Sequence, residues 1–351
     1  MANLNDPQML FKLKAKLFCK INSTEKLASL FDSSVDFLLE IAEKPFYNEF
    51  KIPKKYGDGF RYIEDPEDSL KSILRILNEY LQVVYFGVRS EAAYGFLISP
   101  PFDIAPRNIR SNAQRHCSNE WMLNADFRDF FHQIKYQEVH DIFSCPPFNF
   151  SDEIATILTK LTTYKGRLPM GSPTSPVLSN FATLLLDQDL TKLSNQQAWV
   201  YTRFADDLTF SSHKPIGIED FQKIEYVCTG YGLEFNPSKI RFIPPHEPKV
   251  VTGLVVTDGV DIPSEYYKSL KKEIEKLRTV LQIHFRNGSQ PTKWLTTYQQ
   301  QIEGGIEFIK QIKTADSPNY KNIRRMYDKT LQETEQYEPI GWIEFGYLDF
   351  I

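Results

Sequence analysis

Two adjacent aspartates, Asp206 and Asp207, interrupt an otherwise apolar stretch of the sequence that runs from Trp199 to Phe210. Neighbouring carboxylates repel each other, and each loses hydration when it is partly buried. In a regular strand, successive side chains point to opposite faces, so both acids can serve one site only if the chain turns there. The pattern therefore predicts a tight hairpin at Ala205, Asp206 and Asp207, with a strand on either side. A divalent cation is the natural partner of such an acidic tip, and phosphoryl transfer is its natural use.

A site with two metal ions needs another carboxylate from a neighbouring element, and Asp126 is the candidate. It ends the apolar segment Trp121-Met-Leu-Asn-Ala and precedes Phe127, whose carbonyl oxygen is a further possible metal ligand. An isolated aspartate at a strand end is usually a turn or capping residue, so the prediction depends on its combination with the pair at 206 and 207. We expect two Mg²⁺ ions held by Asp126, Phe127, Asp206 and Asp207.

Length and cysteine usage limit the class of protein. The chain has 351 residues, enough for two or three domains with their own cores. We expect no membrane span and no secretory leader, because no apolar run approaches roughly 20 residues. The four cysteines are far apart and form no Cys-x-x-Cys pair, which favours reduced thiols in a cytosolic protein and argues against a zinc site.

Helix and strand signals alternate irregularly along the chain, which favours the α+β class over regular βαβ repeats. Residues 8–45 show helical spacing of apolar side chains. Residues 47–63 predict two short strands joined by a glycine-rich turn. A strand is expected at Trp121–Asp126, a helix after Pro176, and a helical C-terminal third from about Ser264.

Charge is distributed unevenly. The net charge of −4 argues against a uniformly basic nucleic-acid binder. Residues 264–330 nevertheless carry 13 Lys or Arg against 7 Asp or Glu, whereas the chain from Leu331 onward carries five acids and no Lys or Arg. A locally basic face can bind phosphate, and a solvated helix surface is the competing explanation.

Several segments resemble the reverse transcriptases, and more narrowly the retron reverse transcriptases of bacteria. Phe204-Ala-Asp-Asp207 is similar to the Tyr-x-Asp-Asp box, with Phe204 lacking the usual tyrosine hydroxyl. The other matching segments, which lie between about Phe50 and Gly253 in the family's order, are Asp126–Phe131 (first palm motif), Leu168–Pro176 (template and nucleotide loop), Asn236-Pro-Ser-Lys239 (lysine motif), and the retron elements Asn112-Ala-Gln-Arg-His116 and Val251-Thr-Gly253.

The resemblance implies a right-hand polymerase with an antiparallel sheet in its palm. We expect a helical N-terminal segment at 1–45 and fingers at 46–120 with part of 127–175. The palm then covers 121–260. A helical thumb with an acidic, aromatic tail covers 261–351.

The resemblance also implies roles for individual residues. Asp126, Asp206 and Asp207 would be catalytic, and Phe131 would block a ribose 2′-hydroxyl unless it is simply a core residue. The expected nucleotide-binding residues are Lys54, Lys55, Arg61, Phe131, Gly171, Ser172 and Lys239. The expected RNA-binding residues are Asn112, His116, Val251, Thr252, Gly253, Lys271, Lys272, Arg324 and Arg325. For the lysines a solvated surface is the alternative, and for His116 a satisfied structural role.

The implied activity is RNA-directed DNA synthesis from deoxynucleoside triphosphates (dNTPs). Retron resemblance adds a cognate structured noncoding RNA, priming from its 2′-hydroxyl, a branched RNA–DNA product and a role in bacterial anti-phage defence. A separately encoded effector protein and a cytoplasmic location are expected, and the oligomeric state is left open. The alternatives are an abortive-infection, group II intron or diversity-generating type of reverse transcriptase, a catalytically silent RNA-binding scaffold, and a metal nuclease.

Overall fold

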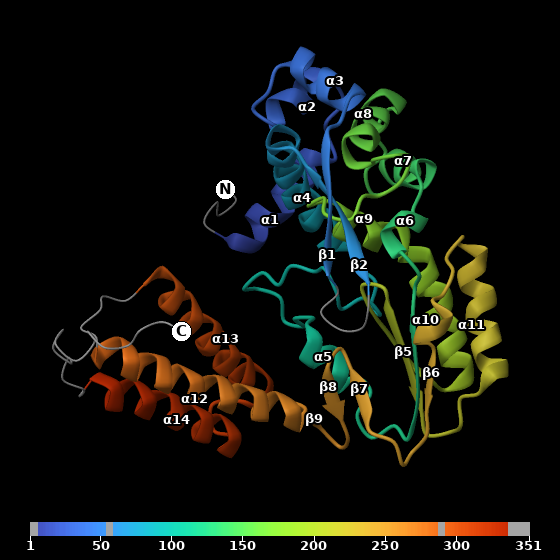
Figure 1. Cartoon of the computed structure of the whole chain (residues 1–351). Helices are drawn as coiled ribbons and strands as arrows, with labels where there is room; N and C mark the ends of the chain where they lie inside the picture. Colours follow the sequence, from blue (N-terminus) through green and yellow to red (C-terminus); the bar gives the residue numbers. More distant parts are fainter. Residues whose placement is uncertain (1–5, 54–58, 287–291, 336–351) are drawn as a thin grey trace. The chain divides into compact units, whose positions relative to one another are not determined.

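The computed structural model describes residues 6–53, 59–286 and 292–335 (Figure 1). The chain divides into two compact units, Met1–Pro248 and Lys249–Ile351. Residues 249–260, which we expected in the palm, fall in the second unit by this division.

The first unit begins with three helices, α1 (Pro7–Phe18), α2 (Thr24–Leu30) and α3 (Val35–Glu43), as the apolar spacing predicts. Each starts at a side chain that accepts a backbone N–H, namely Asp6, Ser23 and Ser34. The strands β1 (Tyr47–Pro53) and β2 (Phe60–Pro66) follow as the expected antiparallel hairpin. The long helix α4 (Asp68–Val88) then buries Leu70, Leu74, Leu77 and Leu81, which repeat every three or four residues.

The centre of the first unit is a four-stranded sheet in the order β4-β5-β3-β6, with every pairing antiparallel. Its strands are β3 (Trp121–Asp126), β4 (Val200–Phe204), β5 (Asp207–Ser212) and β6 (Arg241–Ile243). Leu123, Leu208 and Phe210 contribute fully buried side chains to the core. This arrangement confirms the expected α+β class.

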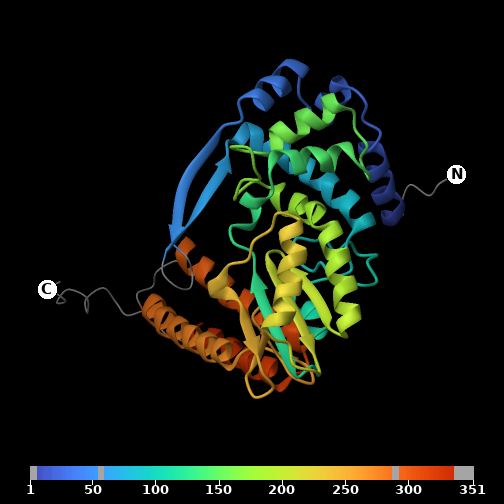
Figure 2. The same cartoon turned by 90° about the vertical axis from the view of Figure 1, so that its right-hand side faces the viewer.

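Helices surround this sheet (Figures 1 and 2). They are α5 (Ile109–Gln114), α6 (Phe130–Gln133), α7 (Tyr136–Ser144), α8 (Asp152–Thr162), α9 (Ser175–Ala182), α10 (Leu184–Gln197) and α11 (Ile218–Gly230), with a short 3₁₀ turn at Pro237–Lys239. The helix α10 contacts both β4 and α11, and it buries Leu186 and Leu190. The helix α9 has Pro176 in its first turn, as expected, and packs against α4 and α10.

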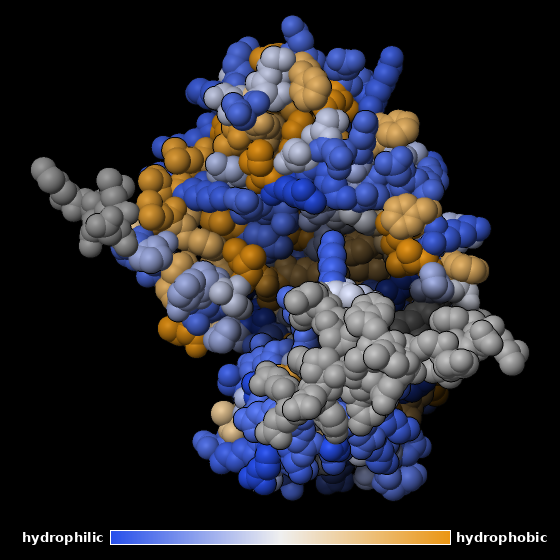
Figure 3. All heavy atoms as spheres, turned by 60° about the vertical axis from the view of Figure 1, so that its left-hand side comes forward, coloured by the Kyte–Doolittle hydropathy of each residue, from blue (hydrophilic) through white to orange (hydrophobic). Residues whose placement is uncertain are grey.

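The second unit starts with a three-stranded antiparallel sheet, β7 (Lys249–Val251), β8 (Leu254–Val256) and β9 (Val260–Asp261). Three helices follow and pack on one another, α12 (Ser264–Arg286), α13 (Lys293–Lys313) and α14 (Pro318–Glu335). Ile274, Leu277, Ile302, Ile306 and Ile323 form their buried seam. The outer surface of these helices is predominantly hydrophilic in Figure 3.

None of the helices in the described ranges combines the length and the apolar character needed to cross a membrane.

Candidate active site

The turn expected to be catalytic is a two-residue loop, Ala205–Asp206, between paired residues Phe204 and Asp207. Ala205 has a φ of 60°, which the tight turns that fit a twisted hairpin require at this position. A left-handed conformation costs a non-glycine residue roughly 1–2 kcal/mol, so the surrounding structure must hold the turn in place. The chain reverses at Ala205 and Asp206, and Asp207 begins the next strand, which confirms the expected hairpin.

Asp126 reaches the same point from the neighbouring strand. Asp126 and Asp207 are direct partners in the antiparallel pairing of β3 with β5. The N–H of Phe127 donates to the carbonyl oxygen of Asp206 at 3.1 Å. Asp126 therefore meets the pair Asp206 and Asp207 at one end of the sheet, as predicted, although 80 positions separate Asp126 from Asp206 in the sequence.

The carboxylates at this end of the sheet perturb one another. Loss of hydration raises the pKa of Asp207, and a hydrogen bond with Asp126 and the charge of Asp206 raise it further. The pKa of Asp206 is raised by desolvation and by Asp126. Each shift has the sign expected when negative charge is concentrated without a cation. The site is therefore electrostatically suited to bind positive charge.

Lys239 supplies one such charge. Its Nζ lies 2.6 Å from Oδ2 of Asp126, whose side chain is buried. Partial burial lowers the pKa of Lys239, but the hydrogen bond to Asp126 and the charges of all three aspartates outweigh it and raise the pKa. The ammonium group therefore stays protonated and neutralises part of the acidic site.

The donor set fits Mg²⁺, which prefers carboxylate and carbonyl oxygens and takes few of them from the protein. Asp126, Asp206 and Asp207 offer such oxygens, and Phe127 lies beside them in the lining of the same cavity as Asp126 and Asp206. Within residues 6–53, 59–286 and 292–335, no three carboxylate, imidazole or thiolate side chains already converge on one cation position. Asp126 instead contacts Lys239.

A cavity of about 970 Å³ opens beside the catalytic residues. Strands β1 and β2 form one wall, and the segment 126–132 forms another. Lys165, Arg167, Met170, Asp206, Asn236 and Lys239 complete the lining. The volume suits a nucleotide-sized ligand.

The cavity is rich in cations, and most of them are already paired. Arg167 donates two hydrogen bonds of 2.8 Å to Glu64, and Lys165 pairs with Glu49 at 2.5 Å. Arg61 is exposed, and none of the ion pairs found among the described residues includes it. Arg61 is therefore the expected nucleotide-binding residue whose charge is available for a triphosphate. Lys54 and Lys55, expected to share this role, lie outside the described residues.

Phe131 is half-buried and lines the cavity together with its neighbour Phe130, which is almost fully buried. The ring of Phe131 lies 5.9 Å from that of Phe96, centroid to centroid. Phe96 also lines the cavity, and it has a φ of 60°. Sequence reasoning missed Phe96, because only the fold brings its loop next to the segment after β3. Phe131 also packs against the core, so its contact with a sugar stays a prediction.

Gly171 and Ser172 do not line this cavity, and their expected nucleotide-binding role stays a prediction. Gly171 has a φ of 133°, and a Cβ atom there would lie 2.8 Å from the carbonyl oxygen of Glu64. Ser172 is buried, and its hydroxyl lies 3.0 Å from that of Thr174. The small residue at 171 thus allows the loop to pack against β2.

His116 and Asn112 also differ from the expected RNA-binding role. His116 is fully buried, with Nδ1 2.7 Å from the hydroxyl of Ser211 and Nε2 2.7 Å from that of Thr202. Burial lowers the pKa of His116 to about 3, so the ring is neutral and joins β4 to β5. Asn112 is 1% exposed. His116 therefore has the structural role that was its alternative, and the burial of Asn112 leaves almost none of its surface open to RNA.

The remaining expected RNA-binding residues lie in the second unit. Thr252 and Gly253 form the two-residue turn between β7 and β8, with φ values of 47° and 82°, and Val251 is buried. Lys271, Lys272 and Arg325 are exposed on the helices. Arg324 instead pairs with Glu303 and Asp328, so its charge is already balanced within the unit.

Comparison with known proteins decides the family. The model of the reverse transcriptase (RNA-dependent DNA polymerase) family matches residues 52–295. The chain is a reverse transcriptase. Membership of this family gives the right-hand polymerase fold and RNA-directed DNA polymerase activity, and it implies dependence on a divalent metal.

The curated relatives are retron enzymes. The retron Ec86 reverse transcriptase of Escherichia coli is 32% identical over 225 residues, which cover 59% of this chain and 69% of that protein. The retron Ec73 reverse transcriptase of E. coli is 30% identical over 341 residues, or 91% of this chain and 98% of that protein. The retron Mx162 reverse transcriptase of Myxococcus xanthus is 27% identical, and the alignment spans 85% of this chain and 65% of that protein. The chain therefore belongs to the retron type.

Among solved structures, telomerase from Candida albicans in complex with a TWJ fragment of telomeric RNA aligns with a TM-score of 0.48 and 10% identity. The alignment covers 89% of this chain and 68% of that one.

Proposed function

We propose that this reverse transcriptase copies a cognate structured noncoding RNA into DNA, starts from a 2′-hydroxyl within that RNA, and leaves a branched RNA–DNA product. The observation that carries the catalytic part is the pairing of Asp126 with Asp207 across β3 and β5, with Asp206 in the adjoining turn. The likeness to retron enzymes supports the RNA-specific part.

Asp126, Asp206, Asp207 and the carbonyl of Phe127 would hold two Mg²⁺ ions. When bound, the ions would favour ionisation of the attacking hydroxyl and balance charge on the leaving pyrophosphate. Lys239, kept protonated beside Asp126, would hold a proton and a positive charge near that pyrophosphate. Arg61 would bind the triphosphate, because a guanidinium suits bidentate contact with phosphate oxygens.

We assign residues 46–120, with part of 127–175, to the fingers and the sheet region to the palm. The second unit, with its β7–β9 sheet and three helices, would serve as the thumb. Lys271, Lys272 and Arg325 would contact the phosphate backbone there. The turn at Thr252 and Gly253 would also meet the RNA. The enzyme would act in the bacterial cytoplasm, where dNTPs are available, in anti-phage defence with a separately encoded effector protein.

The test supplies purified protein with dNTPs, with and without the noncoding RNA encoded beside its gene. We expect DNA to form only with that RNA and to remain attached to it until a debranching enzyme is added. Asp206→Asn with Asp207→Asn should abolish synthesis without weakening RNA binding. DNA made without the RNA would favour the abortive-infection type.

A silent scaffold makes a different prediction. Phage resistance that survives the Asp206→Asn and Asp207→Asn changes would show that binding, and not polymerisation, is the biological function.

A further inference from the structure

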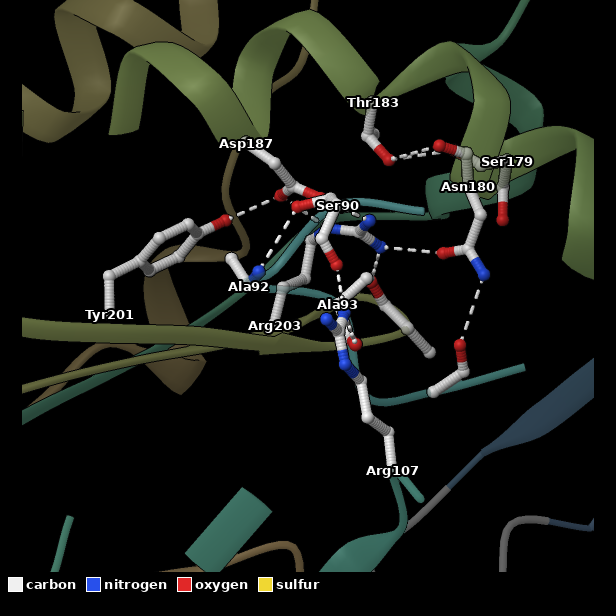
Figure 4. Close-up of polar contacts among 12 residues, drawn as sticks. Ser90, Ala92, Ala93, Arg107, Ser179, Asn180, Thr183, Asp187, Tyr201 and Arg203 are labelled. Carbon is white, nitrogen blue, oxygen red and sulfur yellow. Dashed lines mark hydrogen bonds and ion pairs between the residues drawn. The ribbon is translucent and has the colours of Figure 1, made fainter. Parts of the chain in front are cut away.

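A fully buried arginine lies directly behind the catalytic turn, and the chemistry above does not use it. Arg203 is on β4, two residues before Ala205, and has no exposed surface. A guanidinium group away from water is costly unless its N–H groups are paired. Figure 4 shows its partners Asp187 and Asn180, which come from two helices. A third partner, Ala205, belongs to the turn itself.

The side chain of Arg203 makes four hydrogen bonds. Its Nε and Nη2 donate to the two carboxylate oxygens of Asp187 on α10 at 2.8 and 2.7 Å. Its Nη1 donates to Oδ1 of Asn180 on α9 at 3.1 Å and to the carbonyl oxygen of Ala205 at 3.0 Å. The hydroxyl of Tyr201 donates to Asp187 at 2.8 Å. The carboxylate therefore fixes the plane of the guanidinium, which in turn holds the strained alanine of the turn.

Asn180 extends the network to the wall of the nucleotide cavity. Its Nδ2 donates to the carbonyl oxygen of Gly95 at 3.0 Å (Figure 4). A Cβ atom at Gly95 would lie 2.6 Å from the backbone nitrogen of Ala205, so the two backbones are in direct contact. The next residue, Phe96, lines the cavity opposite Phe131.

The backbone of Arg203 contributes to the same arrangement. Its N–H donates to the carbonyl oxygen of Ala92 at 2.7 Å, and its carbonyl oxygen accepts from the N–H of Tyr94 at 2.8 Å. The segment that carries Gly95 and Phe96 therefore runs beside β4 as far as the turn.

We infer that Arg203 and Asn180 are positioning residues that hold the catalytic turn and the Gly95–Phe96 wall in one fixed register. The turn that carries Asp206, and the loop that places Phe96 beside Phe131, are then held by a single hydrogen-bonded unit. An ion pair buried this deeply is often replaceable by apolar residues without loss of stability. Its contribution here is orientation of the reacting groups.

Asn180→Asp tests the connection to the wall. The substitution keeps the shape of the side chain and its contact with Arg203, but it removes the donor to Gly95 and places a carboxylate against that carbonyl. We expect single-turnover nucleotide addition on a primed RNA template to fall about 10- to 100-fold. Affinity for the primed template should be unchanged, and Mn²⁺ binding followed by electron paramagnetic resonance should weaken.

Thr183→Val is the matched control. Thr183 is also buried, and its hydroxyl donates to the carbonyl oxygens of Ser179 at 2.8 Å and Asn180 at 3.3 Å. The change removes a buried hydrogen bond of α9 without altering the groups that contact the turn. A structural role alone predicts equal losses of rate in Asn180→Asp and Thr183→Val, which would overturn the inference.

A second pair of variants guards against an Asn180→Asp protein that does not fold. Gly95→Ala forces a methyl group against the backbone of Ala205, whereas a methyl group at Gly87 in α4 meets nothing within 4 Å. Gly95→Ala should lose rate and Gly87→Ala should not, when each variant is assayed at a temperature well below its own thermal midpoint. Folded Gly95→Ala protein with the wild-type rate and wild-type Mn²⁺ affinity would overturn the inference.

The inference rests on the catalytic roles proposed for Asp126, Asp206 and Asp207. Measuring Mn²⁺ affinity separates the test of polymerase activity from the test of whether the network positions the turn. Wild-type protein that binds Mn²⁺ but makes no DNA refutes the polymerase proposal. The Mn²⁺ affinities of Asn180→Asp and Gly95→Ala then still decide whether the network positions the turn.

Discussion

Replacing Arg167 with methionine removes the ion-pair partner of Glu64, a buried carboxylate on strand β2. Glu64, on β2, has a side chain that is 5% exposed and receives two hydrogen bonds of 2.8 Å from Arg167. Nε2 of His132 lies 3.3 Å from the same carboxylate, and the N–H of Met170 lies 3.4 Å from it. Methionine keeps most of the apolar stem of the arginine and leaves Glu64 without its main counter-charge.

The expected loss of stability follows from this geometry. Removing one partner of a buried ion pair costs about 3–5 kcal/mol, because the remaining charge stays desolvated. Arg167 is 20% exposed, so water can partly replace it, and His132 and Met170 remain as partners. We therefore expect about 3 kcal/mol. In a unit of this size, that loss lowers the thermal midpoint by about 6–12 °C.

The assay is thermal unfolding followed by circular dichroism, with the double variant Glu64→Gln and Arg167→Met as the control. Removing the unpaired charge should restore most of the lost stability. A loss below about 1 kcal/mol, or a double variant no more stable than the single one, would refute the reasoning.

The pH dependence of this ion pair has a definite sign. Burial raises the pKa of Glu64, but the hydrogen bonds and charge of Arg167 outweigh it, so the pKa lies below its usual value. The stabilisation is therefore fully present above the unfolded pKa of about 4.3 and is lost as the pH falls through the lower folded value. The stability difference between wild type and the double variant should narrow in that acidic range.

Three further predictions concern nucleotide choice, RNA binding and loop packing. Phe131→Ala should raise the kcat/KM for ribonucleotides relative to dNTPs by about tenfold or more, and an unchanged ratio would exclude the expected sugar contact. Replacing Lys271, Lys272 and Arg325 together with alanine should lower the salt-dependence slope of RNA binding by about 2–3. Arg324→Ala should instead lower the thermal midpoint, because it breaks contacts with Glu303 and Asp328. Gly171→Ala should lower the free energy of unfolding by about 2 kcal/mol or more, because residue 171 has a positive φ and contacts Glu64. Gly166→Ala, with a φ of 73° and open space around it, should show only the backbone strain of about 1 kcal/mol. Equal losses at the two glycines would contradict the packing role.

The sequence alone determined the features that depend on neighbouring residues. The reversal at Ala205 and Asp206, the hairpin before α4, the helix that starts around Pro176 and the helical segment from Ser264 all follow from local patterns of charge, turn residues and apolar spacing. The meeting of Asp126 with Asp207 was predicted as well, because a site with two metal ions needs a further carboxylate from an element beside the acidic hairpin.

Only the tertiary structure decided which polar groups are enclosed and what they contact. His116 is held by Thr202 and Ser211, which lie 86 and 95 residues away along the chain. Gly171 is small because Glu64 is beside it, and Arg203 is charged and buried because Asp187 and Asn180 converge on it. Burial and pairing are properties of segments that meet only after folding, so no local pattern of these residues distinguishes a group that binds a ligand from one that supports the fold.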